Sequence, residues 1–210
     1  MLGLLILAGG RSARMGEDKA GLPFPGAADP ALIFRVAGAV ADMAGPPVIA
    51  GPRDYGSGWT LVPDDPQLTG PVAGLVAGLA ASATELVLVL AADLPFPSPG
   101  LARALAARAR TASWAQAVIP SRAGELEPLF AVYRASAAAD LGRAARQLSR
   151  PGQGPSLRQT VAAIRHLEVS EPEWRDWDPQ ARSFLNCNTP AELAEAAALA
   201  LAQPDQGGTW

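Results

Sequence analysis

The sequence of 210 residues predicts an α/β protein in which an open, mostly parallel sheet lies between two layers of helices. The apolar runs 2–7 and 86–92 lack the alternation of a strand with one wet face, so they indicate strands buried on both faces. Segments with helical spacing separate the expected strands, as crossover connections require. We expect a single domain over residues 1–203 and a flexible tail over residues 204–210.

The first half of the chain alternates strands with helices. The expected strands cover 2–7, 47–51, 59–63 and 86–92. The expected helices cover 29–44 and 70–82, and a third begins near residue 98. Asp29 is the expected N-cap of the first helix, with Pro30 as its first helical residue, and Pro71 opens the second. Ser98 followed by Pro99 begins the third in the same way.

The second half is less regular. Strands are expected at 114–120, 127–134 and 166–170, and helices at 135–149 and 188–203. Ser156 and Gln159 form a capping-box pattern at the start of a further short helix. Thr189 and Glu192 form the same pattern at the start of the last helix, with Pro190 between them.

Composition limits the functions that this chain can have. Apolar residues make up 49% and charged residues 18%, which is typical of a globular protein, and the net charge of -3 argues against a nucleic-acid partner. No apolar stretch approaches the roughly 20 residues that span a bilayer, and no basic residues precede the N-terminal apolar run as in a signal peptide. A single cysteine, Cys187, excludes a disulfide framework within the chain. We expect a cytoplasmic protein without a membrane partner.

Ligands of open α/β proteins bind outside the carboxyl ends of the strands, which here are followed by three polar loops. The first loop, in "LAGGRSARMGEDKAGL" (7–22), contains Gly9, Gly10 and Gly16, whose backbone N–H groups are free to form an anion-binding nest. Its cations are Arg11, Arg14 and Lys19. This spacing is neither a P-loop nor a dinucleotide fingerprint, so the alternatives are a polyphosphate site and a plain surface loop.

Carboxylates follow two other predicted strands. Asp93 comes after the run 86–92, where it suits Mg²⁺, which takes few protein oxygens and completes its shell with phosphates and water. A turn or N-cap aspartate is the alternative. Asp64 and Asp65 follow the strand 59–63 and precede a helix, so they are either ligands or turn residues.

Nucleophilic catalysis has little support in this sequence. There is no Gly-x-Ser-x-Gly elbow, and the only histidine, His166, lies in a predicted strand, where a structural role is expected. A phosphate cradle with one metal carboxylate suits phosphoryl or nucleotidyl transfer, in which catalysis is mostly positioning and charge neutralisation.

The stretch "LILAGGRSARMGEDKAGL" resembles the signature loop of nucleoside-triphosphate transferases, and specifically of the molybdenum cofactor guanylyltransferases. Four further segments fit that family in order: "PDDPQLTGPVAGLVAGL", "LVLAADLPF", "EPLFAVYR" and "FLNCNTPAEL". Many nucleotidyltransferases share the first motif, whereas the whole set is more specific. The resemblance implies a Rossmann-like α/β/α sandwich of the nucleotide-diphospho-sugar transferase type.

The resemblance also implies a reaction, in which GMP passes from MgGTP to the terminal phosphate of molybdopterin and pyrophosphate is released. The implied nucleotide-binding positions are Leu7, Ala8, Gly9, Gly10, Lys19 and Asp64. Asp93 matches the magnesium ligand, and Arg11 and Arg14 join Lys19 and Asp93 as implied catalytic residues. Asn186 and Asn188 match paired asparagines at the substrate end, although by themselves they also suit a turn before a capped helix. Molybdoenzymes or their chaperones are further implied partners.

The chain departs from the family pattern at three places, one of which is the stretch "PFPGAADPALIF" (23–34), longer than the usual link between the loop and the first helix. Ala50 and Gly51 stand where the family often has an asparagine that helps to hold the nucleotide, and Ala92 replaces the usual cysteine before the metal aspartate. Alternatives therefore stay open: a molybdopterin cytidylyltransferase, a sugar-phosphate nucleotidyltransferase, or a nucleotide-binding partner without catalytic activity.

Overall fold

A computed structural model describes residues 1–9, 19–24, 31–56, 58–150 and 154–202, without the side chains of Lys19 and Pro190. Its strands are β1 (Leu2–Leu7), β2 (Val48–Ala50), β3 (Thr60–Val62), β4 (Leu86–Ala91), β5 (Ala117–Arg122), β6 (Glu125–Leu126), β7 (Phe130–Arg134) and β8 (His166–Val169). Its α-helices are α1 (Leu32–Gly38), α2 (Pro71–Ala81), α3 (Pro99–Thr111), α4 (Ala138–Leu148), α5 (Leu157–Ala162), α6 (Glu171–Trp174) and α7 (Pro190–Ala202). None of these helices is long and apolar enough to cross a bilayer.

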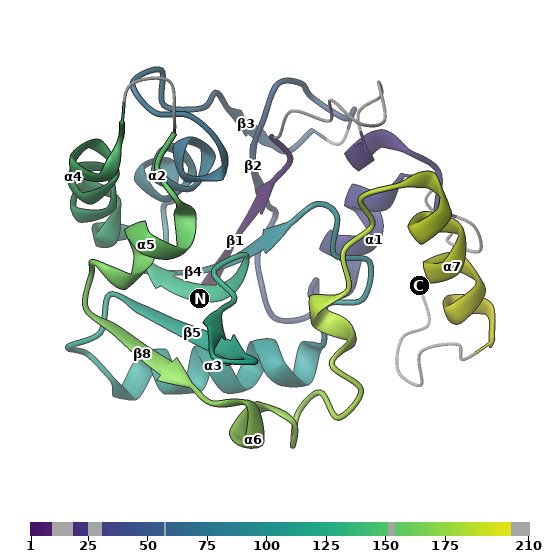
Figure 1. Cartoon of the computed structure of the whole chain (residues 1–210). Helices are drawn as coiled ribbons and strands as arrows, with labels where there is room; N and C mark the ends of the chain where they lie inside the picture. Colours follow the sequence, from purple (N-terminus) through teal and green to yellow (C-terminus); the bar gives the residue numbers. More distant parts are fainter. Residues whose placement is uncertain (10–18, 25–30, 57, 151–153, 203–210) are drawn as a thin grey trace.

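The strands form one mixed sheet in the order β3-β2-β1-β4-β7-β5-β6, and β8 also pairs with β5 (Figure 1). The pairs β2–β3, β1–β2, β1–β4 and β5–β8 are parallel. Strand β7 runs antiparallel between β4 and β5, and the short β6 pairs antiparallel with β5. The sheet is therefore mostly parallel, as the sequence predicts, and the reversed strand lies in its interior.

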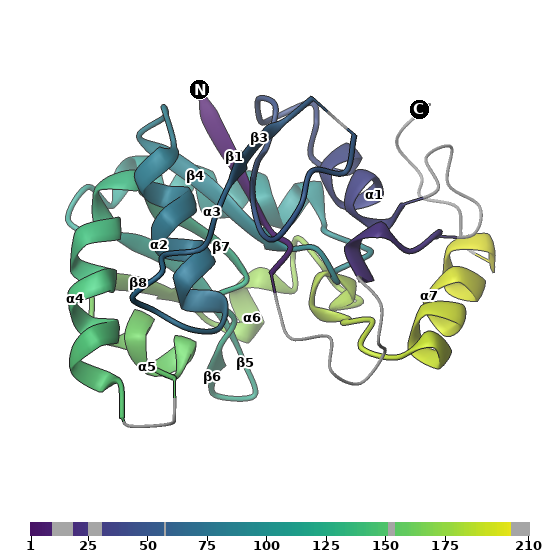
Figure 2. The same ribbon diagram turned by 90° about the horizontal axis from the view of Figure 1, so that it is seen from above.

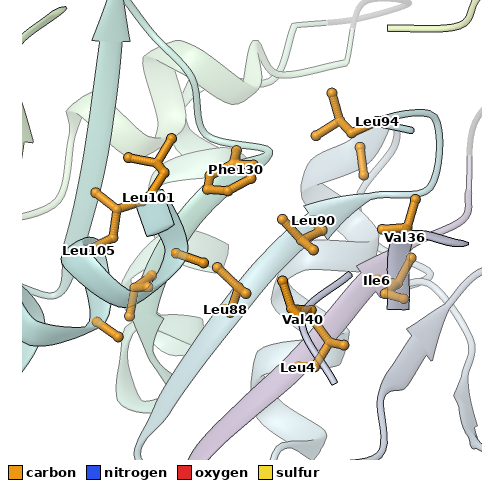
Figure 3. Close-up of a cluster of buried hydrophobic side chains, with 14 of the residues drawn as sticks. Leu4, Ile6, Val36, Val40, Leu88, Leu90, Leu94, Leu101, Leu105 and Phe130 are labelled. Atoms are coloured by element: carbon orange, nitrogen blue, oxygen red, sulfur yellow. The ribbon is translucent and has the colours of Figure 1, made fainter. Parts of the chain in front are cut away.

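Two hydrophobic cores lie on opposite faces of the sheet, which confirms the three-layer α/β/α architecture (Figure 2). Residues of one strand divide between the cores because successive side chains point to opposite faces. Leu4 and Ile6 of β1 join the core under α1 and α3, whereas Leu5 and Leu7 join the core under α2, α4 and α5. Figure 3 shows part of the first core, in which Leu88 and Leu90 of β4 lie among side chains from the helices.

Helix starts follow the capping signals in most cases. Ser98 caps α3 by accepting a hydrogen bond from the Leu101 N–H, and Ser156 caps α5. At α7 the Glu192 N–H donates to the Thr189 hydroxyl, and the Glu192 carboxylate accepts from the Thr189 N–H. This reciprocal pair is the predicted capping box.

Other boundaries differ from the sequence-based expectations. The N-cap of α1 is Ala31, which makes no side-chain cap, and the helix ends at Gly38 rather than near residue 44. Asp29 and Pro30 lie outside the described residues, as does the expected tail 204–210. The sequence also missed the β5–β6 hairpin, whose turn residues Ala123 and Gly124 both have positive φ (50° and 79°).

Glycine at position 78 allows α2 to pack directly on β1. A Cβ atom there would lie 2.3 Å from a methyl carbon of Leu5, which is fully buried. Gly142 of α4 is also helical, but its nearest neighbour would be the flexible end of Arg146 at 3.3 Å. The two helical glycines therefore differ in the space that a methyl group would find.

We expect Gly78→Ala to lower the free energy of unfolding by about 1–3 kcal/mol, because overpacking a tight interface outweighs the gain in helix propensity. Gly142→Ala, the matched control, should leave stability unchanged or raise it by up to about 1 kcal/mol. Chemical denaturation of both variants checks the pair, and equal effects at the two sites would contradict the close α2–β1 contact.

Candidate active site

The loops after β1, β2 and β4 leave the sheet side by side. Strand β1 pairs in parallel with both neighbours, and Leu7 lies opposite Ala50 on one side and Ala91 on the other. Hydrogen bonds continue past the strand ends, since the Ala8 N–H donates to the Ala50 carbonyl (2.8 Å) and the Ala92 N–H donates to the Leu7 carbonyl (3.0 Å). The first residues of all three loops therefore meet at one edge of the sheet.

Small residues make this close approach possible. A Cβ atom on Gly51 would lie 3.1 Å from the backbone carbonyl carbon of Ala8, so a larger residue there would push the β1 loop away. Gly51, with Ala50, is one of the places at which the chain departs from the family pattern. The structure shows that this departure comes with direct packing of the second-strand loop against Ala8.

Asp64 lies between the β1 loop and the first turns of α2. Cβ atoms on Gly9 and Gly74 would lie 3.2 and 3.0 Å from the Asp64 carboxylate oxygens, so this carboxylate occupies the space that both glycines leave open. Partial burial raises the pKa of the Asp64 carboxyl above its ordinary value. The side chain still borders solvent in a cleft, where a ligand can reach it.

The adjacent Asp65 has a different role. Its carboxylate accepts a hydrogen bond from the Gln67 N–H (2.8 Å), and its backbone carbonyl accepts from the Leu68 N–H (3.1 Å). Its own N–H donates to the Ala73 carbonyl in α2 (3.3 Å). Asp65 is therefore the turn residue of the pair, and Asp64 is the one that faces the cleft.

The cleft has a volume of about 1330 Å³. Its walls are the β1 loop, the loops that follow β2 and β3, the start of α2 and the connection from α4 to α5. The lining residues are Gly9, Gly51, Pro52, Leu61, Pro63, Asp64, Gln67, Leu68, Thr69, Gly70, Pro71, Ser149, Arg150, Gly154 and Pro155. Sequence reasoning missed the α4–α5 wall, for which the only signal was a glycine- and proline-rich stretch.

The loop after β4 joins the C-terminal part of the chain. The Cys187 N–H donates to the backbone carbonyl of the half-buried Asp93 (2.9 Å), so the segment "NCN" lies beside the predicted metal ligand. Cys187 is buried, whereas Asn186 and Asn188 on either side of it are exposed. The structure thus brings the predicted Asp93 and the paired asparagines together.

The remaining predicted residues are only partly described. Leu7 is buried at the end of β1, and Ala8 and Gly9 begin the loop beyond it. Lys19 opens a short 3₁₀ helix, Lys19–Gly21, and nothing is described of its side chain. The predicted residues Gly10, Arg11 and Arg14 lie outside the described residues.

A magnesium ion would fit this donor set. Within the described ranges, no group of three or more His, Cys, Asp or Glu side chains could hold a metal by itself. A lone carboxylate such as Asp93, with phosphate oxygens and water, matches the preference of Mg²⁺ for few protein ligands. His166 is half-buried in β8, and its Nδ1 lies 3.0 Å from the Ile164 carbonyl oxygen, in agreement with a structural role.

An open α/β sheet with a glycine-lined cleft and acidic residues beyond the carboxyl ends of its strands is typical of nucleotide-binding α/β proteins. The family model described as "MobA-like NTP transferase domain" matches residues 4–167. The chain therefore belongs to this family of nucleotidyltransferases.

Relatives along the whole chain support this assignment. A probable molybdenum cofactor guanylyltransferase of Chloroflexus aggregans is 35% identical, and the match covers 92% of each chain. A molybdenum cofactor guanylyltransferase of Burkholderia vietnamiensis is 36% identical over 92% of this chain and 94% of its own. The crystal structure of molybdopterin-guanine dinucleotide biosynthesis protein A from Archaeoglobus fulgidus has a TM-score of 0.76 at 25% identity, and covers 97% of this chain and 100% of that chain.

On the prediction that Asp64 binds the nucleotide, we expect Asp64→Asn to weaken GTP binding about tenfold, because an amide oxygen accepts a hydrogen bond less strongly than a charged carboxylate oxygen. Titration calorimetry measures the affinity. Asp65→Asn is the matched control and should change the affinity less than about twofold, since an amide oxygen can still accept the turn hydrogen bond. Equal affinities in both variants would remove Asp64 from the nucleotide site.

Asp64→Asn should also change how the stability of the folded chain depends on pH. Because the pKa of Asp64 is raised, the folded chain holds this proton more tightly than the unfolded chain. The stability that the protonated Asp64 carboxyl contributes is complete below the ordinary Asp pKa. It is lost as the pH rises through the pKa that Asp64 has in the folded state. Thermal unfolding from pH 3.5 to 7 should therefore show that Asp64→Asn gains stability relative to the parent as pH rises.

Proposed function

We propose that this protein transfers GMP from GTP to the terminal phosphate of molybdopterin and releases pyrophosphate. The main support is the hydrogen bond from Ala92 to the Leu7 carbonyl, because it holds Asp93 beside the nucleotide loop. The names of the curated relatives support guanylyl transfer to the molybdenum cofactor in particular. GTP and molybdopterin are thus the proposed substrates, molybdoenzymes or their chaperones the proposed recipients, and the cytoplasm the proposed location.

The proposed reaction needs no general base. The attacking group is a phosphate oxygen of molybdopterin, which is already ionised at neutral pH. It forms a bond to the α-phosphorus of GTP while the bond from that phosphorus to the bridging oxygen of the β-phosphate breaks, and the electron pair leaves with pyrophosphate. The protein therefore acts by holding two anions in line and by neutralising charge.

Each site residue has a part in this proposal. The loop that begins at Gly9 binds the triphosphate through backbone N–H groups, with Lys19 as a point charge. Asp93 would hold Mg²⁺, which would supply charge neutralisation. Asp64, when ionised, only accepts hydrogen bonds, so it suits the donors of a guanine edge or the ribose hydroxyls. Asn186 and Asn188 lie at the Asp93 end, where the second substrate would enter.

Cytidylyl transfer is the nearest alternative. The solved 2-C-methyl-D-erythritol 4-phosphate cytidylyltransferase of Thermus thermophilus covers 95% of this chain with a TM-score of 0.62 at 23% identity, so it shares the fold. The fold by itself therefore does not choose the base. Pyrophosphate release from each nucleoside triphosphate, with Mg²⁺ and molybdopterin, tests it directly; release with CTP but not GTP would overturn the guanylyl assignment.

We expect Asp93→Asn to lower the turnover number at least a hundredfold, because one neutral oxygen replaces the charged metal ligand. The fold should remain intact, since Asp93 is only half-buried at a strand edge. Asp176→Asn is the control, because this exposed aspartate follows α6 away from the cleft. Near-normal turnover of Asp93→Asn across a range of Mg²⁺ concentrations would remove Asp93 from the metal site.

Lys19 offers a second test, because it is the only lysine in the chain and all other basic side chains except His166 are arginines. We expect MgGTP to protect Lys19 from acylation by an amine reagent, with the N-terminal amine of Met1 as internal reference in peptide mapping. Lys19→Ala should raise the KM for GTP about tenfold, since it removes a charged phosphate contact. Unchanged acylation and KM would return the loop to a plain surface role.

A further inference from the structure

A third hydrophobic cluster lies outside the two cores of the sheet, at the side where α1 and α7 are found (Figure 1). Its buried members are Phe24, Leu32, Phe96, Cys187, Ala196 and Ala197. They come from four parts of the chain: the segment 19–24, α1, the loop after β4, and the region from Cys187 into α7. The cluster therefore packs together, outside the sheet, three segments that carry predicted site residues: the segment 19–24, the loop after β4 and the region from Cys187 into α7.

Arg35 of α1 connects the two aromatic members of this cluster. Its guanidinium carbon lies 4.7 Å from the ring centre of Phe24 and 5.0 Å from that of Phe96. The two rings are themselves in edge contact, with centres 6.1 Å apart and planes at 85°. The Arg35 Nε–H donates to the Pro95 carbonyl at 2.8 Å. One half-buried side chain thus contacts both segments at once.

The two segments that Arg35 connects carry two of the charged residues of the proposed chemistry, Lys19 and Asp93. Phe24 ends the segment that Lys19 begins, and its backbone neighbour Pro23 forms a β-bridge with Ala31 just before α1. Pro95 and Phe96 follow Asp93 directly in the loop after β4. The position of Arg35 therefore affects the distance between the segment 19–24, which begins with Lys19, and the Asp93 carboxylate.

Among the contacts that hold the loop after β4, three hydrogen bonds near Asp93 come from different elements. The Ala92 N–H binds the Leu7 carbonyl of β1, and the Asp93 carbonyl accepts from the Cys187 N–H. Arg35 supplies the third contact, at the Pro95 carbonyl. The first two contacts fix Ala92 and the Asp93 backbone, whereas the third fixes the following residues relative to α1 and Phe24.

We propose that Arg35 is a positioning residue that sets the Asp93 carboxylate relative to the segment Lys19–Phe24, and so determines how strongly Mg²⁺ and the triphosphate favour each other's binding. This inference rests on the proposed function. It assigns to Arg35 no contact with substrate or metal; Arg35 acts through Phe24, Pro95 and Phe96.

The chemistry of this contact favours arginine. A planar guanidinium can lie over an aromatic ring while its Nε–H donates in the plane of the guanidinium group, whereas an ammonium group is a strongly hydrated point charge. Lysine at position 35 would keep the charge but lose the simultaneous stacking and hydrogen bond. Arg35→Lys therefore tests whether Arg35 acts through its geometry or only through its charge.

The test measures thermodynamic coupling, that is, how much Mg²⁺ tightens the binding of the nucleotide. Calorimetry with a non-hydrolysable GTP analogue gives the affinity with and without Mg²⁺ for the parent, Arg35→Lys and Arg35→Met. In both variants we expect the tightening by Mg²⁺ to fall about tenfold, which is within the usual range of coupling between sites, while the metal-free affinity changes less than about twofold. Guanidinium ion should restore part of the coupling in Arg35→Ala.

Two further variants keep the test decisive. Arg108→Met is the control, since Arg108 also lies over an aromatic ring, Trp177 at 5.4 Å, and pairs with Glu173 on α6. Phe96→Leu keeps the cluster apolar but removes one stacking face, and should lower the coupling about three- to fivefold. Coupling equal to the parent in folded Arg35 variants, whatever their thermal stability, would overturn the proposal.

This readout is separate from the proposed reaction. If the parent protein binds MgGTP with strong coupling but releases no pyrophosphate, the proposed function fails and the role of Arg35 remains testable. If the parent turns over and the Arg35 variants show parental coupling, the positioning role fails and the function remains.

Discussion

The parallel pairing of β1 with both β2 and β4 is the constraint on which the site depends. Because β1 is hydrogen-bonded on both sides, its carboxyl end cannot move without breaking two ladders. The bonds at Ala8 and Ala92 extend those ladders by one residue into the loops. Gly9 and Asp93 therefore start from positions that the sheet itself defines, before any contact of their side chains is considered.

The residues at this edge of the sheet lower the stability of the fold, and the site requires them. Glycines at 9, 51 and 74 leave space for neighbouring backbone and for the Asp64 carboxylate, and Gly74 also lowers the helix propensity of α2. Burial of Asp64 raises its pKa because the charged form loses hydration. A partly desolvated carboxylate is of little use to a hydrophobic core, but it offers an acceptor to a ligand with N–H or O–H donors.

The sequence predicted the parts of the fold that local pattern determines. Continuous apolar runs identified β1 and β4, and capping residues such as Ser98 and Thr189 located helix starts correctly. The antiparallel direction of β7 has no local signal, because it depends on where the chain re-enters the sheet. Likewise, adjacency in sequence could not separate Asp64 from Asp65; only the turn hydrogen bond at Gln67 shows which carboxylate is already used.

Strand ends alone do not position the loops that follow them, since each added residue brings two rotatable backbone angles. Pro95 and Pro97 reduce this freedom after Asp93, but they also remove N–H donors that could anchor the loop. The N–H groups of Ala92 and Ser98 anchor the two ends of the loop, at Leu7 and Ser183. Between them the loop is held through its carbonyls, at Asp93 by Cys187 and at Pro95 by Arg35. The sheet fixes where the site begins, and the cluster around Phe24 and Phe96 fixes how its two charged segments face each other.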